Sequence, residues 1–315
     1  MSVVRLPLVA AHPLWRAAQS IGVILTVLLL AAFVLAPEAS LHLLWDMVIP
    51  LLPAVFLVNP MIWRNVCPLA TLNELGARRS SGRLLKAPVL AWAVGIGLLV
   101  LMVPARRFLF NANGLAMTVT VTTVAALALL SGLVASRRAG FCNALCPVLP
   151  VEKLYGQAPV LRIGSSRCAD CNRCASACLD LAGAKAAVQS ARSGERARWY
   201  RTPFGLFACA FPGFILGYVR AADGPLSSAP AVYGSIAAWT LGSLAVAVLL
   251  VRLFRVRDVR ALLLLGAASL ATYYWFAAPR LVVAYGGPAG ASEAARTVAL
   301  AAIAAWGVRG WRRLA

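Results

Sequence analysis

Residues 18–36 read AQSIGVILTVLLLAAFVLA and contain no charged side chain. A bilayer core about 30 Å thick is crossed by roughly 20 apolar residues in a helix. The stretch therefore predicts a transmembrane helix, and its length favours a retained span over a cleaved signal peptide. Seven further apolar stretches follow at 43–60, 87–104, 115–135, 204–220, 233–252, 259–278 and 294–311. The stretch at 204–220 is the weakest of the eight, because it is short and Pro212 interrupts it.

Composition and charge support the same fold class. The chain has 315 residues, of which 61% are hydrophobic and 13% are charged, and this excludes an ordinary soluble domain. If the N-terminus is cytoplasmic, 25 of the 30 Lys and Arg residues fall in inner segments, which is the positive-inside pattern. We therefore predict an all-α polytopic protein of about eight transmembrane helices in a bacterial inner membrane, with both termini cytoplasmic. Membrane topology and lipid contact explain the net charge of +20 without a nucleic-acid partner.

A cysteine run between the fourth and fifth spans carries the clearest chemical signal. Its members are Cys168, Cys171, Cys174 and Cys178, with the C-x2-C-x2-C-x3-C spacing of bacterial ferredoxins. Two-residue gaps allow a tight backbone wrap that directs successive thiolates at one cubane cluster. Structural zinc sites usually separate two Cys pairs by a longer loop, so the spacing favours iron–sulfur over zinc. We predict a 4Fe–4S cluster in a small, cytoplasmic, ferredoxin-like segment.

An internal repeat with a period of 79 residues precedes this run. The first copy runs from Trp63 to Gly76 and the second from Cys142 to Gly156, and each contains a Cys-Pro pair. Pro after the Cys suits the first turn of a short helix, which we expect to lie at the membrane surface. The repeat divides the chain into a four-helix membrane domain with the first Cys-Pro turn (1–140), a cytoplasmic segment with the second turn and the cluster (141–203), and a second four-helix membrane domain (204–315).

The remaining cysteines leave the number of clusters open. Cys67, Cys142 and Cys146 fall on equivalent turns of the repeat and are candidates for a redox or ligand site. Cys178 either closes the first cluster or reaches toward these three thiols to complete a second one. In the second arrangement the first cluster needs a distant fourth ligand, and Cys209 is the only cysteine left. Trp63 stands where the second copy has Cys142, so the first copy is incomplete.

The Cys-Pro turns followed by the ferredoxin run resemble the membrane-bound ferredoxin-type proteins of the NapH/NosR group, over about residues 15–180. The resemblance implies a subunit that moves electrons between membrane quinone and a partner redox chain through cubane clusters. The chain differs from that group in having one ferredoxin run where many relatives have two, in Leu179 where a Pro is usual, and in the spans after residue 203.

One acidic and histidine-containing stretch lies on the predicted outer side. Glu38, His42 and Asp46 recur every four residues at the entry to the second span, on one helix face. Ionisable groups near a membrane segment are costly, so this stretch is a candidate quinone or proton site. His12 and His42 lie on opposite sides in this topology, and neither a haem motif nor a nucleotide fingerprint is present, so haem, NAD and flavin are not expected.

Two functions fit these features. In the first, the chain is an electron-transfer subunit, not a stand-alone enzyme, that relays electrons between the quinone pool or a cytoplasmic donor and other redox subunits of a membrane complex. In the second, it is an assembly or maturation factor that uses its cluster as a reductant while a respiratory metalloenzyme is built. A transporter is disfavoured because no inverted repeat is visible.

Overall fold

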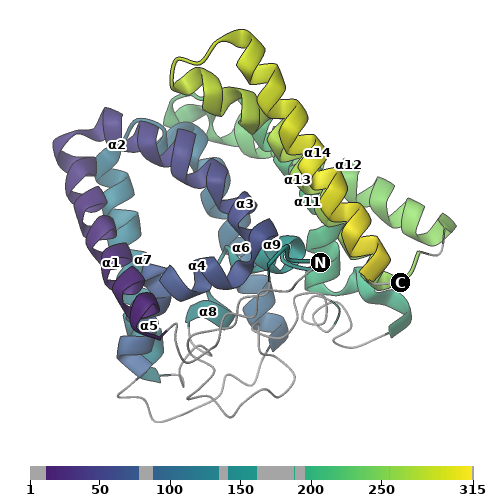
Figure 1. The fold of residues 1–315 in the computed structure, drawn as a ribbon, viewed down its shortest axis with the longest axis horizontal. Coiled ribbons are helices and arrows are strands. Elements are labelled where there is room, and N and C mark those ends of the chain that lie inside the picture. The colour runs from purple at the N-terminus through teal and green to yellow at the C-terminus, as the bar shows by residue number, and fades with distance from the viewer. Residues whose placement is uncertain are drawn as a thin grey trace.

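The computed structural model describes residues 12–77, 88–134, 141–161, 188, 196–254 and 256–313, and within these ranges it contains helices and no strand. Seven helical segments there are long and apolar enough to cross a bilayer. The chain is therefore an all-α, multi-pass membrane protein, as predicted (Figure 1). The membrane helices are α1 (His12–Leu35), α2 (Pro37–Leu43) continued by η1 (Leu44–Val48) and α3 (Ile49–Val58), α6 (Pro88–Ala105) with η2 (Arg106–Phe110), α7 (Gly114–Val134), α11 (Pro203–Arg220), η6 (Leu226–Ser228) with α12 (Ala229–Phe254), and α13 (Asp258–Ala284).

The eighth predicted span is a helix but differs from the other seven. Residues 294–311 lie within α14 (Ala289–Arg313), which packs along α13 and is not among the helices apolar enough to count as a span. Its charged side chains are the reason, since Glu293 and Arg296 occupy the early turns and Arg309 a later one. The structure thus supports seven spans in the described residues where the sequence predicted about eight.

The helices form two groups joined by a central layer (Figure 1). In the first group, α7 packs against α1 and against the short α5 (Pro68–Ala77). In the second group, α11 packs against α12 and α13, and α13 packs against α14. Between them lie α3, α6 and another short helix, α9 (Leu149–Tyr155), which packs against α3, α6, α11 and α13. Helix α6 also packs against α11 and α12. The two membrane domains predicted from the sequence are therefore in direct contact.

Helix α11 is the centre of the second group although its sequence made it the weakest span. It is the most buried of the seven, and it is continuous through Pro212. The Ser243 hydroxyl on α12 donates to the carbonyl of Cys209 at 3.0 Å and so links the two helices near the proline. At Gly213, a Cβ atom would lie 2.1 Å from the Trp239 carbonyl oxygen, so this close helix contact requires glycine.

Candidate functional site

The ferredoxin run lies outside the described residues, so its four cysteines cannot be placed. The chain leading to it is fixed up to Leu161. The amides of Val160 and Leu161 donate to the carbonyls of Leu57 and Val58 at 3.1 and 3.0 Å, respectively. The Asn59 side chain donates to the Leu161 carbonyl at 2.9 Å, which ties this strand-like segment to the end of α3. The run therefore starts seven residues after a point anchored to the second span.

Both copies of the repeat form a helix, a Cys-Pro turn and a second helix. In the first copy, α4 (Pro60–Val66) ends at Cys67 and α5 begins at Pro68. The Asn59 carboxamide oxygen caps α4 by accepting from the Met61 amide at 2.7 Å. In the second copy, α8 (Phe141–Ala144) precedes Cys146, whose amide donates to the Phe141 carbonyl at 3.0 Å.

These turns bring three cysteines together at one end of the bundle. Removal from water raises the pKa of Cys67 to about 12, and the neighbouring Cys142 contributes to the increase. The same desolvation raises the pKa of Cys146, with further contributions from Cys142 and Cys67. We call Cys67, Cys142 and Cys146 the cysteine turn. None of these thiols is in a disulfide, and no set of three metal-ligating side chains is arranged to hold an ion within the described part of the chain.

Cys209 is not part of the cysteine turn. It lies in α11 inside the hydrophobic core, where its backbone carbonyl accepts from Ser243. The electrostatic interactions of Cys67 and Cys146 involve one another, Cys142 and Glu152, and do not include Cys209. Its burial is that of an apolar core residue.

A buried ion pair beside the cysteine turn joins the two copies of the repeat. The Arg64 Nε atom of α4 donates to a carboxylate oxygen of Glu152 in α9, and their side chains are only 10% and 7% exposed. Glu152 also acts electrostatically on Cys67 and Cys146. Sequence reasoning missed this pair, because the two residues occupy unrelated positions in the repeat. The only indication in the sequence was that each is a charged residue within a largely apolar motif.

Helix α9 is buried among other helices of the protein, which the sequence did not indicate. Leu154 and Tyr155 are at most 2% exposed, and the helix packs against α3, α6, α11 and α13. The Gln157 side chain that follows donates to the Leu262 carbonyl of α13 at 3.0 Å. Helix α5, which belongs to the first Cys-Pro motif, is less buried, but its Asn73 and Gly76 are buried against α7. Tertiary packing therefore buries most of α9 and one side of α5.

At the opposite end of the bundle, two of the three residues predicted as a quinone or proton site interact. His42 Nδ1 is hydrogen-bonded to Asp46 Oδ2 at 2.8 Å, and the His42 ring lies 5.3 Å from that of Tyr285. The side chains of His42 and Asp46 are 45% and 35% exposed. Glu38 lies in the first turn of α2, exposed and without an ion pair among the described residues.

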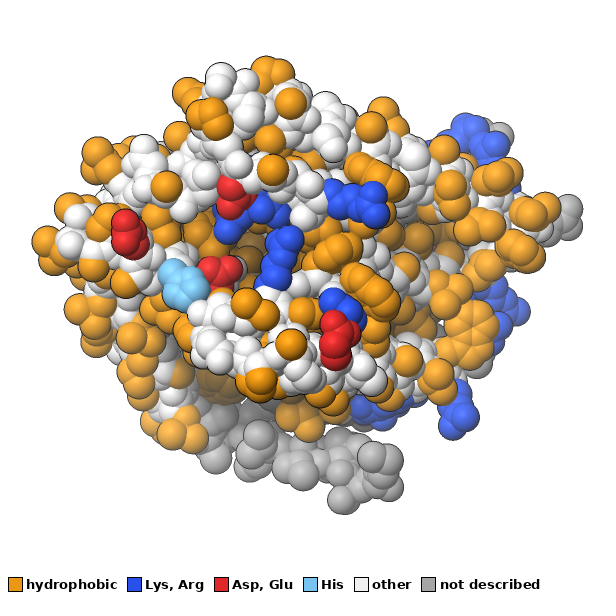
Figure 2. All heavy atoms as spheres, turned by 90° about the horizontal axis from the view of Figure 1, so that it is seen from above, with side chains coloured by type: hydrophobic (Ala, Val, Ile, Leu, Met, Phe, Trp, Pro, Cys, Tyr) orange, Lys and Arg blue, Asp and Glu red, His pale blue; other side chains and the backbone are white. Residues whose placement is uncertain are grey.

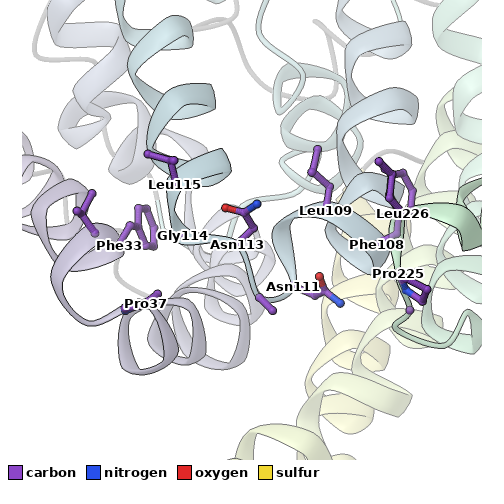
Figure 3. A pocket seen from close by; sticks show the side chains of 13 residues that line it. Phe33, Pro37, Phe108, Leu109, Asn111, Asn113, Gly114, Leu115, Pro225 and Leu226 are labelled. Carbon is purple, nitrogen blue, oxygen red and sulfur yellow. The ribbon is translucent and has the colours of Figure 1, made fainter.

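An apolar groove of about 750 Å³ lies beside the start of α2 (Figure 3). Phe33 and Pro37 line one wall, and Phe108 and Leu226 line the other. Exposed Leu115 borders it, and two amide side chains, Asn111 and Asn113, supply most of its polarity. The groove has the composition of a site for an apolar ligand with a small polar head. Nothing in the sequence had indicated it.

Comparisons of the chain with protein-family models, curated proteins and solved structures found no match. The resemblance of its Cys-Pro turns and ferredoxin run to the NapH/NosR group therefore stays a prediction from the residues themselves.

Proposed function

We propose that the chain is a membrane-anchored iron–sulfur electron-transfer subunit, relaying electrons between the quinone pool or a cytoplasmic donor and a partner redox complex. The observation that carries this proposal is the convergence of Cys67, Cys142 and Cys146 at the end of the bundle from which the chain leaves toward the ferredoxin run. The described chain thus leaves toward the second cysteine-rich motif from the region that holds the first.

The length of the connecting chain supports this common location. Cys168 is seven positions after Leu161, and an extended chain of seven steps reaches at most about 25 Å. A cluster held by Cys168, Cys171, Cys174 and Cys178 would therefore lie near the same end as the cysteine turn. The four thiolates fit a 4Fe–4S cluster by type and spacing, and such a cluster supplies reversible one-electron transfer.

The cysteine turn supports a structural or relay role over nucleophilic catalysis. A thiol whose pKa is about 12, as for Cys67, is protonated at neutral pH and therefore a poor nucleophile. The Arg64–Glu152 pair links α4 to α9 and so holds the two Cys-Pro turns in place relative to each other. These features favour transfer of electrons through the region without a reaction at its sulfur atoms.

The quinone part of the proposal is supported at the other end. The apolar groove and the His42–Asp46 pair both border α2, and they offer an apolar surface and a proton acceptor, respectively. Quinol oxidation releases protons, and a histidine hydrogen-bonded to a carboxylate is suited to accept one.

Electron paramagnetic resonance, combined with iron and sulfide analysis of the protein purified under nitrogen, tests the proposal. We expect a cubane signal after reduction and about four iron and four sulfide per chain. A colourless, iron-free or zinc-containing protein would overturn it. Co-purification decides the setting: a stable stoichiometric complex with redox proteins supports the electron-transfer subunit, whereas transient association with an unassembled enzyme supports the maturation factor.

A further inference from the structure

Two arginines share one carboxylate at the end of the bundle opposite the cysteine turn. Asp223 Oδ1 accepts from Arg106 Nη1 at 2.8 Å and from Arg107 Nη1 at 2.7 Å. Arg107 is otherwise satisfied, because its Nε and Nη2 atoms donate to the Tyr218 carbonyl at 3.2 and 2.9 Å and its guanidinium stacks on the Tyr218 ring. One negative charge thus faces two positive charges.

A third arginine, Arg280 of α13, belongs to the same region. Arg106, Arg107 and Arg280 all interact electrostatically with the Tyr218 hydroxyl, and Arg106 and Arg280 also interact with that of Tyr273. These tyrosines are therefore the common neighbours of guanidinium groups from two elements, η2 and α13. We call Arg106, Arg107 and Arg280, with Asp223, Tyr218 and Tyr273, the arginine hollow.

Several donors of the arginine hollow have no protein acceptor. Within the described residues, the Arg106 side chain donates hydrogen bonds only to Asp223, through Nη1, and its guanidinium lies 5.7 Å from the centre of the Trp45 ring. Its Nε and Nη2 atoms therefore have no hydrogen-bond acceptor there. Arg280 is exposed and reaches only the Val219 carbonyl, through Nη2 at 3.4 Å. Figure 2 shows a hollow on this face with Lys/Arg, Asp/Glu and His side chains gathered around it. Arg280 is exposed at the surface, and the Arg106 side chain is 16% exposed.

The carboxylates available do not neutralise this cluster. Asp46 is bonded to His42 at the neighbouring η1, and Asp223 already serves two arginines. The three arginines exceed these two carboxylates by one positive charge when His42 is neutral. Both described π-helical segments, η1 and η2, lie beside the hollow, and such segments are frequent at functional sites. The charge, the free donors and the shape all favour an anionic ligand.

We propose that the arginine hollow binds a tetrahedral oxyanion of the phosphate class, either free or as the phosphate of a lipid headgroup. Guanidinium groups approaching from different elements match an oxyanion with several equivalent oxygens better than a planar carboxylate, which Asp223 already supplies. The hollow lies at the ends of membrane helices, the level at which basic pockets bind headgroup phosphates. This inference does not depend on the proposed electron-transfer function.

The test uses the full-length protein in two arms. In detergent without added lipid, calorimetric titration with inorganic phosphate reports the free ion. In nanodiscs with and without phosphatidylglycerol, native mass spectrometry reports retained anionic lipid. The variants are Arg280→Gln and Arg106→Gln, which remove unused donors and spare Arg107, the most buried of the three. The control is Arg296→Gln on α14, which removes an arginine stacked over Trp275 at 4.9 Å outside the hollow.

We expect a single saturable site in one arm, weakened at least tenfold in Arg280→Gln and Arg106→Gln and unchanged in Arg296→Gln. Loss in the phosphate arm identifies a free oxyanion, and loss in the nanodisc arm identifies a headgroup. Binding that is absent in both arms, or that Arg296→Gln weakens equally, overturns the proposal. Melting temperatures of the variants, measured in parallel, separate loss of binding from loss of folding.

Discussion

The two ends of the bundle differ in how their charged side chains are paired and exposed. At the cysteine turn, one arginine meets one glutamate, both nearly inaccessible, and the pair joins two copies of a repeat. At the arginine hollow, two arginines share an aspartate that is 42% exposed, and a third arginine reaches one carbonyl. The first arrangement is nearly inaccessible to water, whereas the second leaves hydrogen-bond donors without a protein acceptor among the residues that the structure describes.

This difference separates structural charges from binding charges. A buried ion pair contributes little net stability compared with an apolar pair, but it is very costly to break. A half-exposed cluster is cheaper to alter, and its charges remain available to ligands and to salt. Substitutions at the cysteine end should therefore affect redox chemistry and folding, and those at the arginine end should mainly affect binding.

The largest effect is expected at the cysteine end itself. Cys171→Ala should abolish the cluster signal and remove essentially all iron, because a cubane does not stay bound with a ligand of the ferredoxin run missing. Cys146→Ala should keep the cluster signal and the iron content, since we propose one cluster held by the ferredoxin run alone. Iron analysis and paramagnetic resonance measure the outcome. Loss of half the iron in Cys146→Ala would instead indicate a second cluster at the cysteine turn.

Breaking the buried pair should produce the next largest effect. Arg64→Met removes the ion-pair partner in α4 from the buried Glu152 carboxylate, and we expect a loss of up to about 3–5 kcal/mol in the free energy of unfolding. The double variant Arg64→Met/Glu152→Leu should recover most of that loss. Unfolding in mixed micelles provides the measurement.

The matched control is Arg296→Met, which removes one partner of the exposed Arg296–Glu293 pair. It should cost less than about 1 kcal/mol. Equal losses for Arg64→Met and Arg296→Met would mean that burial does not distinguish the two ends.

The shared carboxylate should show an intermediate effect with a distinctive salt response. Asp223→Asn leaves two neighbouring guanidinium groups without a counter-charge, and we expect a loss of about 1–2 kcal/mol in the free energy of unfolding. Added phosphate should restore part of this loss, because an anion can take the place of the carboxylate. Thermal unfolding with phosphate and with chloride at equal ionic strength makes the comparison; identical responses to both salts would argue against a phosphate site.

The smallest change in stability is expected for the His42–Asp46 pair, which joins α2 to η1. His42→Leu and Asp46→Leu should each alter the free energy of unfolding by less than about 1 kcal/mol, because both side chains are well solvated. They should nevertheless slow quinol-dependent reduction of the cluster, while reduction by dithionite stays normal. Unchanged quinol-dependent rates would remove His42 and Asp46 from the proposed quinone site.

The local features of the chain were well predicted, whereas the long-range contacts were not. Seven of the eight apolar stretches form long apolar helices, and the two Cys-Pro motifs form helix–turn–helix units. The charged residues of α14 weakened the eighth prediction. The neighbourhood of Cys67, Cys142 and Cys146 followed from their equivalent positions in a repeat, but the core position of Cys209 did not follow from its spacing.

The sequence by itself determined the membrane-spanning character and the cysteine spacing, because these depend on about 20 consecutive residues or fewer and on the properties of water and lipid. It also determined the repeat, which is visible by comparing the chain with itself. Only the tertiary structure decided which charges meet. Arg64 and Glu152 are 88 positions apart, and Arg107 and Asp223 are 116 apart. Such pairs arise when helices pack, and a lone charged residue in an apolar stretch carries no record of its partner. The burial of α9 has the same origin, because it depends on the surfaces of α3, α6, α11 and α13 that enclose it.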